Sequence, residues 1–151
     1  MSDKNTPQEL PSWISDHVSL YLEDPDAGHD WDSTFAGGPG ILPTLLLTTT
    51  GRKSGQLKTT PLIYHRSDDS FVVIASKGGA PAHPAWYLNL IANRDSEVLV
   101  RRERHRVVPR TAEGQEREAL WEKLAEIYPP YNDYQAATER KIPVVVLEVT
   151  E

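Results

Sequence analysis

Residues 45–56 read Leu-Leu-Leu-Thr-Thr-Thr-Gly-Arg-Lys-Ser-Gly-Gln, and this stretch is the most informative part of the chain. Its first half is apolar and β-branched, which is typical of a buried strand. Gly51 and Gly55 then bound a turn that carries the adjacent cations Arg52 and Lys53. Such a turn suits a phosphate or another polyanionic group, because cations and backbone amides replace the water that the anion loses. An ordinary solvated hairpin turn is the alternative. A Walker loop is excluded, because Arg52 stands where that loop needs glycine.

The segments around this turn predict a mainly β fold. Strands are expected at 44–50, 59–66, 71–76, 97–111 (one long or two short strands) and 143–149. The first three are joined by short turns, which predicts an antiparallel meander. Helices are expected at 12–22, 83–92 and 113–128. Many strands with a few inserted helices predict a β-barrel with helical decorations.

Composition excludes several classes of protein. The length of 151 residues predicts one domain with a substantial core, and the absence of cysteine excludes disulfides and thiolate chemistry. The five histidines show no metal-ligand spacing, and neither a hydrolase Gly-x-Ser-x-Gly elbow nor a Rossmann glycine motif occurs. No long basic stripe supports a nucleic-acid partner. Without an apolar run of membrane-span length or a secretory signal, we expect a cytoplasmic protein, and peripheral contact with a membrane stays open.

Three further motifs are candidates for a ligand site. Ser76-Lys77-Gly78-Gly79 follows an apolar strand, where a lysine can anchor a flat ring and glycines allow close approach. Trp86 and Asn89 are spaced for one face of a helix. Tyr128, Tyr131 and Tyr134 recur every three residues and can hold a polar substrate. The alternatives are a strand-exit turn, a core helix and an aromatic rim. A fourth set of residues, Arg101, Arg102, Arg104, Arg106 and Arg110, reads as a solvated strand face.

Taken together, these motifs resemble one protein family. The 45–56 stretch is followed by Pro61-Leu62, Ala75-Ser-Lys-Gly-Gly79, Pro84-Ala-Trp-Tyr-Leu-Asn-Leu90 and Tyr128-Pro-Pro-Tyr-Asn-Asp-Tyr134. Their order and spacing, over roughly residues 41–149, resemble the deazaflavin-dependent nitroreductase family. The resemblance implies a split β-barrel of the flavin-reductase and pyridoxamine-phosphate-oxidase kind. It also implies an oxidoreductase that uses reduced coenzyme F420 to reduce a small electron-poor acceptor such as a quinone, an enone or a nitro compound.

The resemblance also assigns site residues. The implied cofactor-binding residues are Arg52, Lys53, Ser54, Gly55, Lys58, Thr60, Pro61, Ala75, Ser76, Lys77, Trp86, Tyr87 and Asn89. Those implied on the acceptor side are Ile63, Tyr128, Tyr131 and Tyr134. Ser76, Lys77 and Tyr131 are the implied catalytic residues, with Lys77 at the ring and Tyr131 orienting the acceptor. Nitroreductase members often have an aromatic residue at the position of Ile63. The isoleucine leaves the implied use of F420 intact and counts against nitroimidazoles as acceptors.

Residues 1–40 differ from the rest of the chain in charge. They hold eight acidic residues and one lysine, whereas residues 41–151 hold fifteen basic and fourteen acidic residues. Ser12 is suited to cap the helix at 12–22, and residues 24–40 predict a loop. We expect residues 1–40 to cover the cofactor cleft as a lid outside the barrel core, and residues 41–151 to form the deazaflavin-binding barrel. The alternative is that Trp13, Ile14 and Val18 belong to the core.

Two rival functions stay open. One is a flavin mononucleotide (FMN)-dependent reductase or oxidase on the same barrel, which the choice of cofactor would separate. The other is a carrier that binds the deazaflavin without turnover. The coenzyme would bring the redox chemistry, which agrees with the lack of a nucleophile or metal motif. The sequence gives no indication of the oligomeric state.

Overall fold

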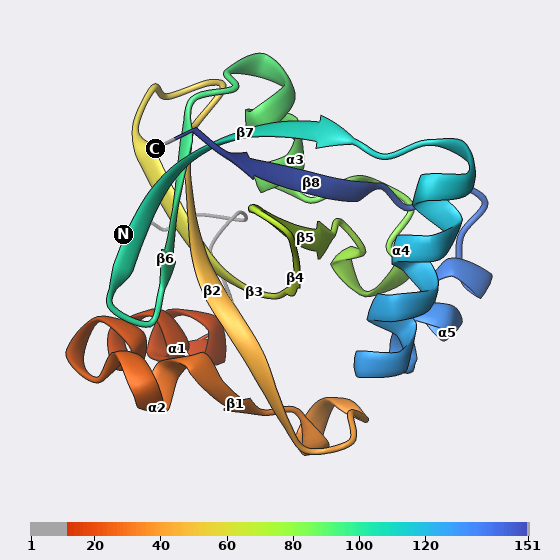
Figure 1. Ribbon diagram of the computed structural model, residues 1–151, viewed down its shortest axis with the longest axis horizontal. Coiled ribbons are helices and arrows are strands. Elements are labelled where there is room, and N and C mark those ends of the chain that lie inside the picture. The colour runs from red at the N-terminus through yellow and green to blue at the C-terminus, as the bar shows by residue number, and fades with distance from the viewer. Residues whose placement is uncertain (1–11, 151) are drawn as a thin grey trace.

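The computed structural model describes residues 12–150 as a coiled antiparallel sheet with helices against it (Figure 1). The strands are β1 (Asp30–Asp32), β2 (Ile41–Thr50), β3 (Leu57–Ile63), β4 (His65–Ser67), β5 (Ser70–Ile74), β6 (Ser96–Val100), β7 (Glu103–Thr111) and β8 (Val144–Val149). The helices are α1 (Ser12–Glu23), α2 (Pro25–His29), α3 (Ala85–Ala92), α4 (Gly114–Ile127) and α5 (Pro130–Ala136), and the 3₁₀ turns are η1 (Thr34–Ala36) and η2 (Lys77–Gly79). The mainly β class with helical decorations is confirmed.

Strand β2 pairs with three other strands, β1, β3 and β6. The strand order is β1-β2-β6-β7-β8-β5-β4, with β3 paired to β2. Because β2 is ten residues long, it reaches β1 through its first three residues and β3 through the other seven. In Figure 1 it crosses the molecule from the β1 end to the yellow β2–β3 turn. The sheet thereby curls around an apolar interior and carries the predicted anion turn at its rim.

Alternating side chains give the sheet two apolar faces. Leu45, Leu47, Val73 and Leu147 are almost fully buried in the barrel interior. On β5 and β8 the neighbouring residues point to the other face, where they pack against α4 and the tyrosines of the α4–α5 region, whereas Leu46 of β2 packs against Tyr21. This two-residue period is what pleated strands impose, and it explains why both faces of β5 and β8 are apolar.

The second predicted strand differs from the expectation. It divides at Tyr64, so that β3 pairs with β2 while β4 pairs with β5. Strand β5 then pairs with β8 instead of β3, so the simple three-strand meander is wrong. The physical reason is the curl of the sheet, because a strand that turns the corner of a barrel must exchange one neighbour for another.

The N-terminal segment is more ordered than a loop. Residues 24–40, expected as one loop, contain α2, β1 and η1, and β1 pairs with β2, so the sheet crosses the predicted boundary at residue 40. Tyr21 of α1 is fully buried against Leu46 and Leu99, and its hydroxyl donates to the Thr44 carbonyl at 2.9 Å. Helix α1 is therefore attached to the barrel core, contrary to the expectation that it lies outside it. The predicted cap by the Ser12 side chain lies outside the described part of the chain.

Candidate functional site

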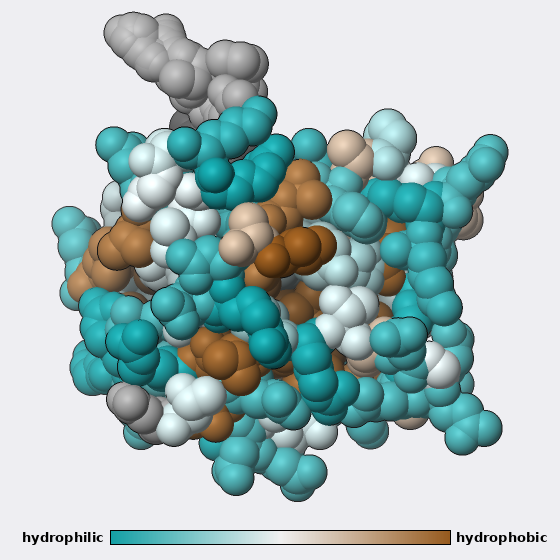
Figure 2. Space-filling view, turned by 90° about the horizontal axis from the view of Figure 1, so that it is seen from above, coloured by the Kyte–Doolittle hydropathy of each residue, from teal (hydrophilic) through white to brown (hydrophobic). Residues whose placement is uncertain are grey.

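The β2–β3 turn presents the predicted cations to solvent. Arg52, Lys53, Ser54 and Gly55 are all exposed, whereas Gly51 is buried. The turn is closed by two backbone hydrogen bonds, from Gly51 N to the Gln56 carbonyl at 2.7 Å and from Gly55 N to the Gly51 carbonyl at 2.8 Å. Figure 2 shows this end of the molecule from above, with hydrophilic residues over most of it and separate apolar patches. The turn therefore offers a hydrogen-bonded backbone and solvent-exposed cations to an anion.

Asn89 fastens this turn to helix α3. Its side-chain oxygen accepts a hydrogen bond from Arg52 N at 3.0 Å, and its amide nitrogen donates to Thr49 Oγ1 at 3.2 Å. Asn89 is only 4% exposed, so neither bond competes with bulk water. The structure thus brings together two predicted cofactor residues that are far apart in the sequence. Asn89 acts on the turn, and its side chain is already occupied.

The Ser76–Gly79 loop adopts a left-handed conformation. Lys77, Gly78 and Gly79 have φ values of 47°, 63° and 84°. Lysine seldom adopts positive φ, and such strain occurs where surrounding contacts enforce it. The Lys77 side chain is exposed and Ser76 is half-buried, so both predicted catalytic residues can meet a ligand.

Arg140 is a residue of this region that the sequence did not indicate. Its guanidinium donates to the carbonyls of Ala80 at 2.8 Å, Ser76 at 2.7 Å and Ala75 at 3.3 Å. In the sequence it lies within Glu139-Arg140-Lys141, a polar run that is typical of a solvated loop. Its acceptors are backbone carbonyls more than fifty positions away, and no sequence signal marks such acceptors.

The three predicted acceptor-side tyrosines lie together. The Tyr131 ring makes edge contacts with both of the others, with its centroid 4.9 Å from that of Tyr128 and 6.2 Å from that of Tyr134. The Tyr128 and Tyr134 hydroxyls are 3.0 Å apart, and Tyr128 also donates to the Ala36 carbonyl at 3.1 Å. Burial raises the pKa of Tyr131, with smaller contributions from the two neighbouring phenols. Tyr131 therefore stays protonated and can donate a hydrogen bond, but it is a poor proton source.

The remaining predicted residues divide between surface and core. Lys58 is exposed on β3, and Thr60, Pro61 and Trp86 are half-buried. Ala75 and Ile63 are buried, so Ala75 can meet a ligand only through its backbone. Tyr87 is 9% exposed, and its hydroxyl lies 2.9 Å from Thr111 Oγ1 of β7. That hydroxyl is engaged within the protein, which favours the core interpretation of Tyr87.

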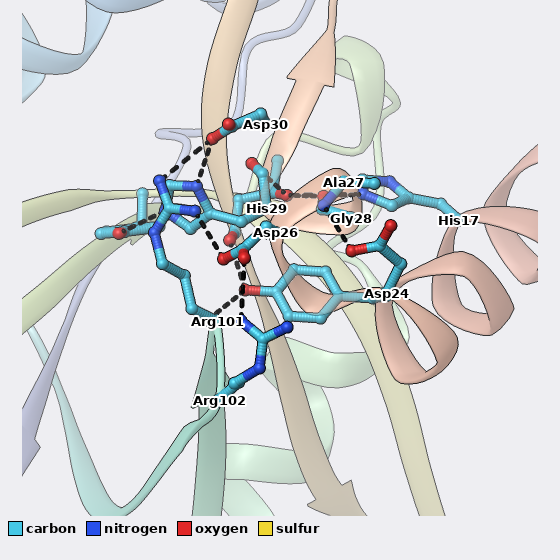
Figure 3. A network of polar contacts seen from close by, with 12 residues as sticks. His17, Asp24, Asp26, Ala27, Gly28, His29, Asp30, Arg101 and Arg102 are labelled. Carbon is cyan, nitrogen blue, oxygen red and sulfur yellow. Dashed lines mark hydrogen bonds and ion pairs between the residues drawn. The ribbon is translucent and has the colours of Figure 1, made fainter.

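An ion-pair network joins the N-terminal segment to the β6–β7 hairpin (Figure 3). Asp26 accepts from Arg101 at 3.0 Å and from Arg102 at 2.8 Å, and Asp30 accepts from Arg101 at 3.2 Å. The hydrogen bond from Arg102, and then that from Arg101, lowers the pKa of Asp26. The five arginines are exposed as predicted, but these two are engaged with the acidic segment.

Two shallow hollows in the described residues lie away from most of the predicted site. One, of about 260 Å³, lies between Trp13, His17 and Trp31, and the other, of about 230 Å³, lies beside Arg94 and Tyr87. Within residues 12–150, no group of three or more His, Asp or Glu side chains is placed to hold a metal ion. None of the helices described is both long and apolar enough to cross a membrane.

Comparison with known proteins gives consistent matches. The family model of F420H(2)-dependent quinone reductases matches residues 30–149. An F420H(2)-dependent quinone reductase of Mycobacterium tuberculosis is 44% identical over 145 residues, which cover 92% of this chain and 97% of the relative. A solved F420-H2 dependent reductase is 42% identical with a TM-score of 0.65, over 70% of this chain and 94% of that chain.

Two other solved structures are also similar. A domain-swapped dimer is 36% identical with a TM-score of 0.68, over 91% of this chain and 98% of its own. A Listeria innocua protein described as a pyridoxamine 5'-phosphate oxidase is 11% identical with a TM-score of 0.52, over 72% of this chain and 84% of its own, which is a likeness of fold alone. The predicted split β-barrel is thereby confirmed.

Proposed function

The chain belongs to the F420H(2)-dependent quinone reductase family, and we propose from this that it is an oxidoreductase that uses reduced coenzyme F420 to reduce a quinone-type small molecule. When bound, the coenzyme supplies a hydride, so the protein needs to position two molecules and needs no nucleophile of its own. The relatives support a quinone in particular. Reduction of enones and nitro compounds stays a prediction, and Ile63 makes nitroimidazoles the weakest candidate among them.

The residues present fit a coenzyme with a phosphate and an acidic tail. The observation that carries the proposal is the turn bearing Arg52 and Lys53, whose backbone is held by the buried Asn89. Lys58 on the adjoining strand adds a third exposed cation. Fixed amides and cationic side chains suit an anion, because little must be reorganised when it binds. FMN has only a phosphate, so it stays the minor alternative.

The loop and the tyrosines would then serve the two reactants. Ser76 and Lys77 would border the ring, while Tyr131 would hold the acceptor through a hydrogen bond. Because burial raises the pKa of Tyr131, we assign it an orienting role and assign the proton that completes quinone reduction to water. Turnover with any acceptor would exclude the non-catalytic carrier.

The role of residues 1–40 stays a prediction. The Ala36 carbonyl accepts a hydrogen bond from Tyr128, so this segment reaches the acceptor side of the site. Such a contact supports a cover over the acceptor, although Tyr21 fixes α1 to the barrel. Cytoplasmic location and peripheral membrane contact are likewise predictions. The domain-swapped dimer among the similar structures is a reason to measure the oligomeric state of this protein.

The test is cofactor titration of wild-type protein and two double variants. Arg52→Ala with Lys53→Ala should weaken F420 binding by about 2–4 kcal/mol, or roughly 30- to 1000-fold in Kd, through the loss of charge-assisted contacts. Arg104→Ala with Arg106→Ala removes the same charge from exposed positions of β7 and should leave the Kd within about threefold. Wild-type protein is then assayed with a quinone, an enone and a nitroimidazole. Equal affinity in the two double variants would contradict the anion site, and tighter binding of FMN than of F420 would favour the rival cofactor.

A further inference from the structure

We propose that Arg140 is a positioning residue for hydride transfer, because it holds the Ala75–Ala80 loop in the conformation that presents Ser76 and Lys77 to the cofactor ring. The inference rests on the proposed function. Among the described residues, Arg140 makes no hydrogen bond or ion pair with the predicted anion turn, and the partners of its guanidinium all belong to the loop or to its immediate continuation.

The guanidinium binds both ends of the loop at once. Its Nε donates to the Ala80 carbonyl, whereas Nη1 and Nη2 donate to the Ala75 and Ser76 carbonyls. Nη1 also lies 3.0 Å from His83 Nδ1, which accepts a hydrogen bond from the guanidinium. A planar fork of five donors can make these contacts together, which a lysine ammonium on a single flexible stem cannot reproduce. The geometry of the group, more than its charge, therefore determines the shape of the loop.

The contacts of Arg140 are unusual for an arginine. Among residues 12–150, no carboxylate lies within ion-pair distance of it, and its acceptors are three carbonyls and one imidazole. A half-buried guanidinium with neutral partners gains no ion-pair energy. Its guanidinium supplies a donor to the Ala75 and Ala80 carbonyls and a second donor to the Ser76 carbonyl. Such a residue has a clear structural use in fixing that turn.

The loop needs this support because it is strained. Lys77 adopts a φ of 47°, a left-handed conformation that residues with a Cβ atom avoid. The Ser76 carbonyl accepts from Gly79 N at 2.9 Å and from Arg140 at 2.7 Å. The turn and the guanidinium contacts of Arg140, called the clamp below, therefore share one acceptor. Without the clamp, Lys77 can relax toward negative φ, and the loop then changes the direction of both predicted catalytic side chains.

Arg140 is itself attached to α5, the helix that carries Tyr131 and Tyr134. Gln135 of α5 donates from its side chain to the Arg140 carbonyl at 2.8 Å. The same loop also touches α5 directly, because Gly79 lies against the Tyr134 backbone. The clamp thus links the ring side of the site to the acceptor side. Hydride transfer depends steeply on the separation of the reactants, so a shift of about 1 Å is expected to lower the rate about 100-fold.

Arg140→Lys tests the proposal, since it keeps the charge and the stem. We expect kcat to fall at least tenfold, with the F420 Kd within about threefold of the wild-type value because the anion turn is untouched. In the apoprotein, amide hydrogen exchange across residues 75–83 should accelerate. Arg106→Lys, at an exposed position of β7, is the matched control and should change neither quantity. In Arg140→Ala, added methylguanidinium at millimolar concentration should restore part of the lost rate.

Several results would overturn the proposal. Unchanged exchange in apo Arg140→Lys would show that the clamp does not hold the loop. Faster exchange with an unchanged kcat would show that the loop does not position the reactants. Folded Arg140→Ala that methylguanidinium does not rescue would count against a geometric role, and if that variant does not fold, Arg140→Lys decides alone. Failure of the proposed function is distinguishable, since wild-type protein would then bind no F420 or reduce no acceptor while the apoprotein exchange is still measurable.

Discussion

Gly79→Ala should disrupt the contact between the Ser76–Gly79 loop and helix α5. A Cβ atom at Gly79 would lie 2.7 Å from the Tyr134 carbonyl oxygen and 3.0 Å from its Cα, and both are backbone atoms that cannot rotate away. The φ of +84° adds a second penalty, because residues with a Cβ atom avoid this region. The left-handed backbone costs about 1–2 kcal/mol and overpacking about 1–3 kcal/mol. The sum predicts a loss of about 2–5 kcal/mol, a large part of the ~5–15 kcal/mol typical of a domain.

Gly78→Ala is the matched control for this variant. Gly78 has a φ of +63°, yet nothing lies within 4 Å of the position that a Cβ atom would take there, so only the backbone penalty of about 1–2 kcal/mol applies. Urea denaturation of both variants measures the difference in free energy of unfolding. Quinone reduction by folded Gly79→Ala should also be slow, because α5 must move to relieve the clash. Equal destabilisation by the two substitutions, or normal turnover in Gly79→Ala, would refute the contact between the loop and α5 as a determinant of the site.

Two further predictions concern the acceptor side. Tyr131→Phe should lower turnover about tenfold and leave F420 affinity unchanged, because a bond made to the acceptor contributes nothing to the binary complex; parallel loss of cofactor binding would show instead that the tyrosine is structural. Trp13→Ala removes an aromatic side chain that packs against Trp31 and Phe35 at the start of α1. If the N-terminal segment covers the acceptor, this variant should raise the acceptor KM severalfold, whereas Leu22→Ala, at an exposed position of the same helix, should leave it unchanged. Equal kinetics in the two variants would argue against a lid.

Local patterns predicted most of the secondary structure, since they depend on neighbours in the sequence. The β2 strand follows from its apolar, β-branched run, and the α4 helix follows from helical spacing. Helix α5 was missed because Pro129-Pro130 reads as a terminator. Pro130 is in fact in the first turn of the new helix, where the missing N–H has no partner to lose. The division at Tyr64 also escaped prediction, because strand pairing in a curled sheet is decided by distant segments.

The site residues were predictable to the extent that their own chemistry marks them. Two adjacent cations on a glycine turn, or three tyrosines in seven residues, stand out in any sequence. Asn89 was indicated as a polar group beside a ligand, yet its side chain binds the turn and Thr49. Arg140 gave no signal, because its partners are carbonyls that every residue possesses. Contacts that a site makes with backbone carbonyls have no signature in the sequence, so they are found only once the fold is known.

The arrangement separates affinity from reactivity. The cations that would hold the coenzyme are on the β2–β3 turn, which is fixed to α3 through Asn89. The groups that would set the reacting geometry are in the C-terminal part of the chain, where Arg140 and Tyr134 hold the Ser76–Gly79 loop. Because no described hydrogen bond or ion pair joins Arg140 to that turn, changes in the two regions should act on different kinetic quantities and add independently. The turn should determine the Kd for F420, and the clamp should determine kcat. A double variant that combines Arg52→Ala with Arg140→Lys should then show the sum of the two single effects in free energy, and a clear departure from that sum would mean that the coenzyme couples the two regions.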